Sequence, residues 1–155
     1  MSAVSLDIID SRLIAELQKD NRISVADLCD LIGLTPATCH RRLKRLRESG
    51  LIIKEAALVD PRLSARPLTV IIEITLAQNR IAFEKKLSLL KEISMCWAVS
   101  GPVDFVAVGH FRDVEHYRAF MVAELIDNEN VKRQTSAIVV DRIRFNLEME
   151  FAVES

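Results

Sequence analysis

The 155-residue sequence has no apolar run that approaches the roughly 20 residues needed to cross a membrane. Its first residues, MSAVSLDIID, lack a basic segment followed by an apolar core, so we expect no secretory signal. Half of the residues are hydrophobic and 28% are charged, which is typical of a globular rather than a disordered chain. Together these features predict a cytoplasmic protein with one domain or two small ones.

Cysteine and histidine are scarce, with three residues of each kind. Cys29, Cys39 and Cys96 are odd in number and widely spaced, and two of them fall on helical faces that we expect to pack inward. We interpret all three as reduced core residues of a cytosolic protein. The histidines show no ligand spacing with the cysteines, so we predict no metal site and no cofactor.

The net charge of −1 favours no class of partner, but one short segment is strongly positive. Residues 34–50, LTPATCHRRLKRLRESG, hold five cations and a single acid, Glu48. Thr35 can cap a helix there, Pro36 fits its first turn, and Gly50 can end it. A narrow apolar stripe recurs along it at helical spacing: Cys39, Leu43 and Leu46. A solvated surface helix is the alternative to a DNA-binding one.

The residues before this segment favour the DNA-binding interpretation. Residues 6–20 have the pattern of an amphipathic helix, and Ser24 with Asp27 can open a short second helix through Ile32. Gly33 closes that helix one residue before the next cap. A short helix, a tight turn and a basic helix form a helix-turn-helix, whose second helix enters the major groove of DNA.

The residues of the predicted recognition helix are expected to contact DNA in two ways, through bases and through phosphates. Arg41 can form a fork with a guanine, and Thr38 or Ala37 can contact a thymine methyl group. The cations farther along the helix are expected to bind phosphates. For Arg42, the alternative is an ion pair within the domain with an acidic residue such as Asp27 or Asp30. The predicted DNA-binding residues are Thr35, Pro36, Ala37, Thr38, His40, Arg41, Arg42, Lys44 and Arg45, with Arg47 as a further phosphate contact.

The chain changes character near residue 60. Residues 51–59, LIIKEAALV, could form a short strand pair or wing, and Asp60-Pro61 is a turn signal. We therefore predict a helix-turn-helix domain over residues 1–52, a linker over 53–66, and a second domain over 67–155. In the last segment apolar and polar residues alternate from Ile143 to Phe151, which indicates a half-buried strand.

The second domain has the pattern of a ferredoxin-like βαββαβ fold, so the whole chain is predicted to be α+β with a winged helix-turn-helix first. Strands are expected at 68–77, 95–100, 105–111 and 136–151, and helices at 81–93 and 113–126. In this fold the helices cover one face of the sheet. Because several strands are apolar on both faces, we expect a second copy to cover the other face in a two-fold dimer.

The ordered set of motifs resembles the leucine-responsive regulatory protein family, Lrp/AsnC, over nearly the whole chain. The resemblance rests on LDIIDSRLIAELQKDNRIS at 6–24, LTPATCHRRLKRLRESGLI at 34–52, VDP at 59–61, SGPVDF at 100–105 and QTSAIVV at 134–140. It implies a transcriptional regulator that dimerises, commonly assembles to octamers, and binds an amino acid or related small molecule as effector.

The resemblance also implies an effector pocket between dimers. By position, Gly101, Asp104, Thr135 and Ser136 would line it, with Asp104 receiving an α-ammonium group and the hydroxyls holding an α-carboxylate. An ordinary hairpin turn is the alternative for Gly101 and Asp104. The chain departs from the family at Val103, where an aromatic residue is usual, and at Ala65, where a linker glycine is usual.

Two other functions compete with a regulator. An enzyme would need Asp104 to pair with His110 or His116 as acid and base, but the sequence has no nucleophile–base spacing or glycine-rich phosphate loop. We therefore predict no catalytic residue and no enzyme activity. A small-molecule-binding module that regulates a partner protein is the second alternative, and it leaves the cations between Arg41 and Arg47 unexplained.

Overall fold

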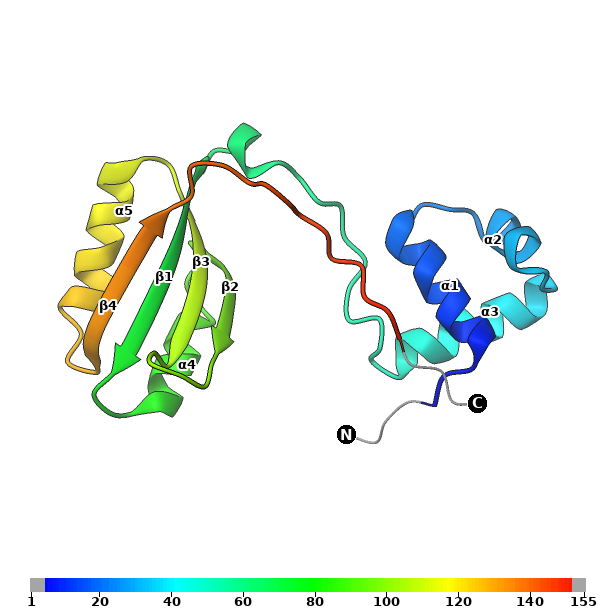
Figure 1. The fold of residues 1–155 in the computed structure, drawn as a ribbon, viewed down its shortest axis with the longest axis horizontal. Helices are drawn as coiled ribbons and strands as arrows, with labels where there is room; N and C mark the ends of the chain where they lie inside the picture. Colours follow the sequence, from blue (N-terminus) through cyan, green and yellow to red (C-terminus); the bar gives the residue numbers. More distant parts are fainter. Residues whose placement is uncertain (1–4, 152–155) are drawn as a thin grey trace. The chain divides into compact units, whose positions relative to one another are not determined.

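The computed structural model describes residues 5–151, and its internal contacts divide the chain into two compact units. The first unit contains the residues up to Ala57 together with those from Arg144 onward, and the second contains Leu58–Ile143. The predicted second domain runs to residue 155, whereas the contacts group its last segment with the first unit. Figure 1 shows the elements of each unit.

The first unit is built around three helices, α1 (Ile8–Lys19), α2 (Val25–Ile32) and α3 (Pro36–Glu48). Each begins at a polar cap, namely Asp7, Ser24 and Thr35, whose side chain accepts a hydrogen bond from a backbone N–H in the first turn. The start of α1 was predicted at Leu6. It lies two residues later because Asp7 and Asp10 form a reciprocal capping box.

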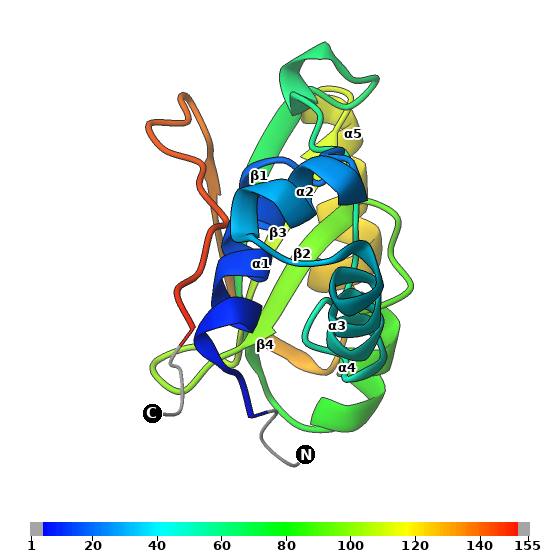
Figure 2. The ribbon, with the colours of Figure 1, turned by 90° about the vertical axis from the view of Figure 1, so that its right-hand side faces the viewer.

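A tight connection joins α2 to α3. Gly33 ends α2 with a left-handed φ of +77°, a conformation that favours glycine. Because α2 ends at Ile32 and α3 begins at Pro36, the connection consists of Gly33, Leu34 and Thr35, and Figure 2 shows it as the coil between the two helices. The predicted helix-turn-helix is thereby confirmed. Its core consists of Leu6, which precedes α1, and of apolar side chains from all three helices: Leu13, Ile14, Leu28, Cys29, Ile32, Cys39, Leu43 and Leu46.

The second unit is a four-stranded antiparallel sheet in the order β2-β3-β1-β4, with two helices on one face. This is the predicted ferredoxin-like βαββαβ arrangement. Its elements are β1 (Leu68–Leu76), α4 (Arg80–Leu87), β2 (Ile93–Ala98), β3 (Phe105–Phe111), α5 (Val114–Met121) and β4 (Val131–Ile138), with a short 3₁₀ turn at Pro61–Leu63 and a π-helical turn at Val122–Ile126.

The core of the second unit lies between the sheet and the helices. Alternate residues of the central strand β1, Val70, Ile72 and Ile74, are buried against Phe83 of α4 and Phe120 of α5. The intervening residues of β1 face the other side of the sheet, as strand geometry requires. Within Leu58–Ile143, no helix covers that face, as predicted, and the Trp97 and Ile71 side chains are partly exposed.

The last strand differs from its prediction. β4 begins at Val131, five residues before the predicted start, and ends at Ile138 rather than Phe151. Among the described strands, β4 pairs with β1 alone. Because β1 begins at Leu68, the ladder ends where Val139 N donates to Thr69 O at 2.9 Å. Residues 139–151 therefore lie outside the sheet despite their alternating pattern.

Three smaller expectations also differ. Residues 51–59, predicted as a strand pair or wing, contain no strand, and Ile53 is 92% exposed. The helix predicted through Ile93 ends at Leu87, because Ile93 already starts β2. Cys96 is exposed, whereas Cys29 and Cys39 are buried as predicted, and burial raises the pKa of the Cys39 thiol to about 11.

Candidate DNA-binding helix and effector site

The outer surface of α3 presents the residues that were predicted to read bases. Pro36, Ala37, His40 and Arg41 are exposed, and Thr38 is half-buried. Thr38 Oγ1 accepts a hydrogen bond of 3.0 Å from the cap hydroxyl of Thr35, which orders the first turn. The opposite face of the helix is buried in the core, so this row is the part of α3 that can enter a groove.

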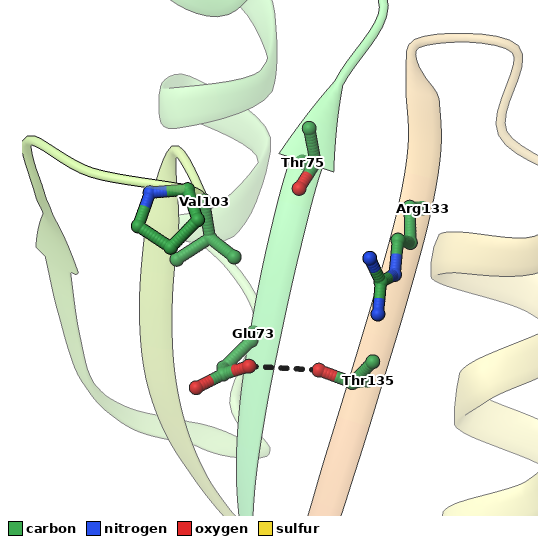
Figure 3. A pocket seen from close by; sticks show the side chains of 6 residues that line it. Glu73, Thr75, Val103, Arg133 and Thr135 are labelled. Carbon is green, nitrogen blue, oxygen red and sulfur yellow. Dashed lines mark hydrogen bonds between the residues drawn. The ribbon is translucent and has the colours of Figure 1, made fainter.

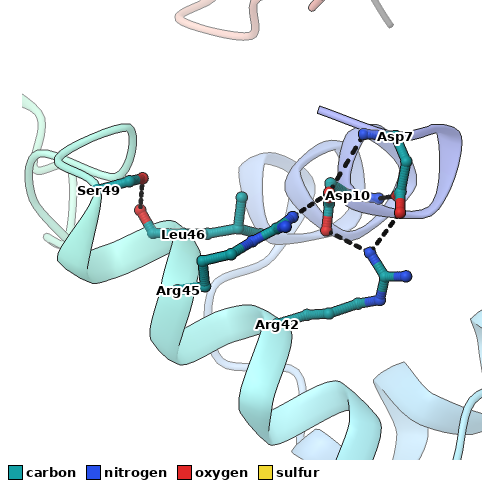
Figure 4. A network of polar contacts seen from close by, with 6 residues as sticks. All are labelled: Asp7, Asp10, Arg42, Arg45, Leu46 and Ser49. Carbon is teal, nitrogen blue, oxygen red and sulfur yellow. Dashed lines mark hydrogen bonds and ion pairs between the residues drawn. The ribbon is translucent and has the colours of Figure 1, made fainter. Parts of the chain in front are cut away.

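A buried carboxylate connects α1 to α3. Asp10 is fully buried, and its Oδ1 accepts a hydrogen bond of 2.8 Å from Arg42 Nη1, while its Oδ2 accepts one from Arg45 Nη2 (Figure 4). Arg42 Nη1 also donates to Asp7 Oδ2 at 2.6 Å. Two arginines of α3, about one helical turn apart, therefore bind the same carboxylate of α1. This pairing fixes the position of α3 relative to α1.

The first carboxylate of this network is stabilised in its charged form. The pKa of Asp7 is lowered, mainly by the hydrogen bond from the Asp10 backbone N–H and then by the Arg42 guanidinium. A carboxylate with a lowered folded-state pKa stabilises the fold above its ordinary pKa, and this contribution is lost as the pH falls through the lowered value. The cap and ion pair should therefore weaken only in acid.

The other cations of α3 differ in what holds them. Arg47 Nη2 lies 2.9 Å from Glu55 Oε1, and Lys44 Nζ lies 3.7 Å from Glu48 Oε1, both at exposed positions where ion pairs are weak. Within residues 5–151, Arg41 makes no such contact with a carboxylate. The alternative considered for Arg42, an ion pair within the unit, is present, but its partners are Asp10 of α1 and the cap residue Asp7 rather than Asp27 or Asp30.

A second candidate site is a hollow on the open face of the sheet, between β1, β4 and the turn before β3 (Figure 3). Glu73 and Thr135 are paired across the two strands, and Thr135 Oγ1 donates to Glu73 Oε2 at 2.8 Å. The lining residues are Glu73, Thr75, Pro102, Val103, Arg133 and Thr135. The hollow thus presents a carboxylate, a guanidinium and two hydroxyls on one face.

The structure distributes the four predicted effector residues differently. Thr135 lies in the hollow, and Gly101 directly precedes its Pro102–Val103 wall. The Asp104 carboxylate instead accepts a hydrogen bond of 2.8 Å from the Leu76 backbone N–H, which fastens the turn to the irregular end of β1. The Ser136 hydroxyl donates to Gln134 Oε1 at 3.2 Å and lies near Met121 of α5, on the helix-covered side.

Sequence reasoning missed Glu73, Thr75 and Arg133 as lining residues. A signal for Glu73 was present, because it is the one charged residue within the apolar strand LTVIIEITLA and has the same parity as Ile71 and Thr75. Arg133 could not be found in that way. The predicted last strand began at residue 136, so Arg133 lay outside every predicted element.

The chain combines a helix-turn-helix unit with a separate sheet unit, and these define a DNA-binding regulator with a ligand-binding domain. A model of winged helix-turn-helix DNA-binding domains matches residues 6–53, and a model of the Lrp/AsnC ligand-binding domain matches residues 69–148. The chain belongs to the Lrp/AsnC family of transcriptional regulators. Neither model extends to residues 149–151.

Curated relatives and solved structures agree with this assignment. The leucine-responsive regulatory proteins of Haemophilus influenzae and Escherichia coli are 33% and 34% identical over 144 and 145 residues, covering 90% of this chain and 87% of each relative. A Neisseria meningitidis transcriptional regulator solved with L-methionine superposes with a TM-score of 0.86 at 25% identity, covering 94% of this chain and 96% of that one.

No helix within residues 5–151 is long and apolar enough to span a membrane. In the same described range, no group of three His, Cys, Asp or Glu side chains is arranged to hold a metal ion. The homologues are transcriptional regulators rather than enzymes.

We predict that Asp10→Ala lowers the free energy of unfolding of the helical unit by about 3 kcal/mol, because it leaves two guanidinium groups without their shared buried acceptor. Denaturant titration followed by helical circular dichroism measures this loss. Asp30→Ala, at an exposed position of α2, is the matched control and should change stability by no more than about 0.5 kcal/mol. Equal effects of the two substitutions would show that the network contributes little.

Proposed function

We propose that the protein binds specific DNA sites through the N-terminal half of α3. The single observation that supports this most directly is the exposed row of Pro36, Ala37, His40 and Arg41, whose one arginine contacts no carboxylate within residues 5–151. A guanidinium free to form two parallel hydrogen bonds is suited to the O6 and N7 atoms of guanine. Such a regulator acts on the chromosome, so we place it in the cytoplasm.

The remaining cations are proposed to contact phosphates. They differ in how exposed they are and in how firmly carboxylates of the protein already bind them. Lys44 and Arg47 are exposed and lie in weak surface pairs that DNA can replace. Arg45 is half exposed while one of its nitrogens is bound to Asp10, so it can present the rest of its guanidinium in a fixed orientation. Arg42 is the least available, because its Nη1 is shared between two carboxylates.

We predict that Arg41→Ala and Lys44→Ala affect DNA binding in different ways. Arg41→Ala should cost about 1–3 kcal/mol at one base position and relax the choice of base there. Lys44→Ala should weaken binding to all sequences alike and reduce its dependence on salt. Affinities measured on a library of single-base operator variants decide between these outcomes. An equal loss of affinity for every operator variant with Arg41→Ala would assign that residue to a phosphate. If the unmodified protein showed no salt-dependent DNA binding, a small-molecule-binding module that regulates a partner protein would be favoured instead.

We propose that the ligand of the second unit is an amino acid or a close relative. The Neisseria meningitidis regulator similar to this chain was solved with L-methionine. In the hollow, Glu73 offers a carboxylate for an α-ammonium group, and Arg133 offers a guanidinium for an α-carboxylate. Thr135 already donates to Glu73, so it holds that carboxylate in place. The role of ammonium partner therefore moves from Asp104 to Glu73 in this proposal.

We predict that Glu73→Gln weakens amino-acid binding at least about tenfold, because a charged acceptor is replaced by a neutral one. Asp104→Asn is the matched comparison: its amide oxygen can still accept from Leu76 N–H, so binding should change little. Calorimetry with the twenty amino acids on all three proteins measures this. The reverse order of effects would restore Asp104 as the ammonium partner, and absence of any binding would remove the effector from the proposal.

We propose that the open face of the sheet is covered by a second copy of the chain. Its apolar side chains include Ile71 of β1 together with Met95 and Trp97 of β2, which are 39%, 38% and 50% exposed. A two-fold dimer buries such a face against itself and provides two recognition helices for a near-palindromic site. Association of dimers to octamers, as the family resemblance implies, would place further copies around this core.

We predict that Ile71→Glu converts the dimer to a monomer at micromolar concentration, because it would place two charges against an apolar interface. Ile81→Glu is the matched control, since Ile81 is 82% exposed on α4 at the helix-covered side of the sheet. Light scattering gives the mass of each protein. A monomeric unmodified protein, or a dimer that survives Ile71→Glu unchanged, would contradict this assembly.

A further inference from the structure

The last described residues of the chain are bound to the first helix. The Gln18 side chain on α1 forms two hydrogen bonds with one residue of the C-terminal segment: Gln18 Nε2 donates to Met149 O at 2.9 Å, and Met149 N donates to Gln18 Oε1 at 2.8 Å. An amide that satisfies both the N–H and the C=O of one residue imitates a neighbouring strand. This contact joins residues 131 positions apart.

Two residues later the chain contributes to the core of the same unit. Phe151 is half-buried and packs against the apolar cluster of α1, α2 and α3. The residues just before it are far more open: Ile143 is 90% exposed and Leu147 is 54% exposed. The segment is thus anchored near its end, while Ile143 and Leu147 before the anchor are largely exposed.

Through this non-covalent attachment, the C-terminal segment becomes a second chain connection between the helical unit and the sheet. The chain leaves the first unit after Ala57 and returns to it at Arg144. The returning segment comes directly from β4, whose residues Arg133 and Thr135 line the hollow. A unit held by two chain connections has fewer allowed orientations than a unit held by one flexible linker.

We infer that Met149–Phe151 forms a strap that docks on α1 of its own chain and restricts the orientation of the recognition helix. The polar part of the strap is the Gln18–Met149 pair, and the apolar part is Phe151 in the helical core. When the strap is docked, the DNA-binding unit is tethered at both ends; when it is released, only residues 53–66 restrain it. This inference rests on the proposed function in one respect, namely that two such units read one DNA site.

Hydrogen exchange tests the docking without any DNA or effector. In the unmodified protein the Met149 amide should exchange at least about tenfold more slowly than the Leu147 amide of the same segment. Gln18→Ala should abolish that difference, and Gln78→Ala, an exposed glutamine of the second unit, should preserve it. A Met149 amide that exchanges as fast as the Leu147 amide in the unmodified protein overturns the strap.

Half-site spacing tests the consequence. An operator is selected from random DNA with the unmodified protein, and variants are made with two base pairs inserted or removed between the half-sites. The unmodified protein should lose about tenfold or more in affinity on the altered spacings, and Phe151→Ala should lose less than about threefold. Leu147→Ala is the matched control and should behave like the unmodified protein.

The two measurements separate the possible failures. If Phe151 only stabilises the helical unit, Phe151→Ala lowers affinity for every spacing by the same factor, and the strap is contradicted. If the unmodified protein selects no operator, the proposed function fails, and the exchange measurement alone decides whether the strap exists. Mixed dimers of isotopically labelled and unlabelled chains then show whether the Met149 contact forms within one chain; a contact between chains overturns the inference as stated.

Discussion

Each residue of β1 can face only one side of the sheet, and most of the second unit depends on this constraint. Val70, Ile72 and Ile74 point to the helices and form the centre of the core. Ile71 and Glu73 must then point to the open face, where one contributes apolar surface and the other a carboxylate. Because β1 pairs with both β3 and β4, it also brings the Pro102–Val103 turn beside Arg133 and Thr135. The core, the proposed interface and the hollow therefore share one strand.

In the helical unit the comparable role belongs to Asp10. Its carboxylate is removed from water, and such a group is tolerated only when it is paired and hydrogen-bonded. Arg42 and Arg45 provide that pairing, so charges on a helix made for DNA also fasten it to α1. The basic helix thus has two populations of cation, one committed to the scaffold and one available at the surface. Counting its positive charges overstates what DNA can reach.

Local signals were enough to predict most elements. Ser24, Gly33 and Thr35 act through neighbouring backbone groups, so the helix-turn-helix could be derived from spacing alone. The third strand was predicted at its observed bounds, Phe105–Phe111, because turn residues Gly101-Pro102 precede it and the helix cap Asp113 follows it. The last strand was misplaced because alternation shows only that one face of a segment differs from the other. It does not show which strand, if any, lies beside that segment.

The sequence by itself determined the class of protein, the order of the elements and the surface of α3 that faces outward, since these depend on periodicity and on caps within a few residues. Only the tertiary structure decided where side chains distant in the chain meet. It assigned Arg42 to Asp7 and Asp10, turned the Asp104 carboxylate to the Leu76 amide, and brought Met149 to Gln18. The physical reason is that hydrogen bonds and ion pairs depend on distances of a few ångströms between atoms, and these are set by packing rather than by separation along the chain.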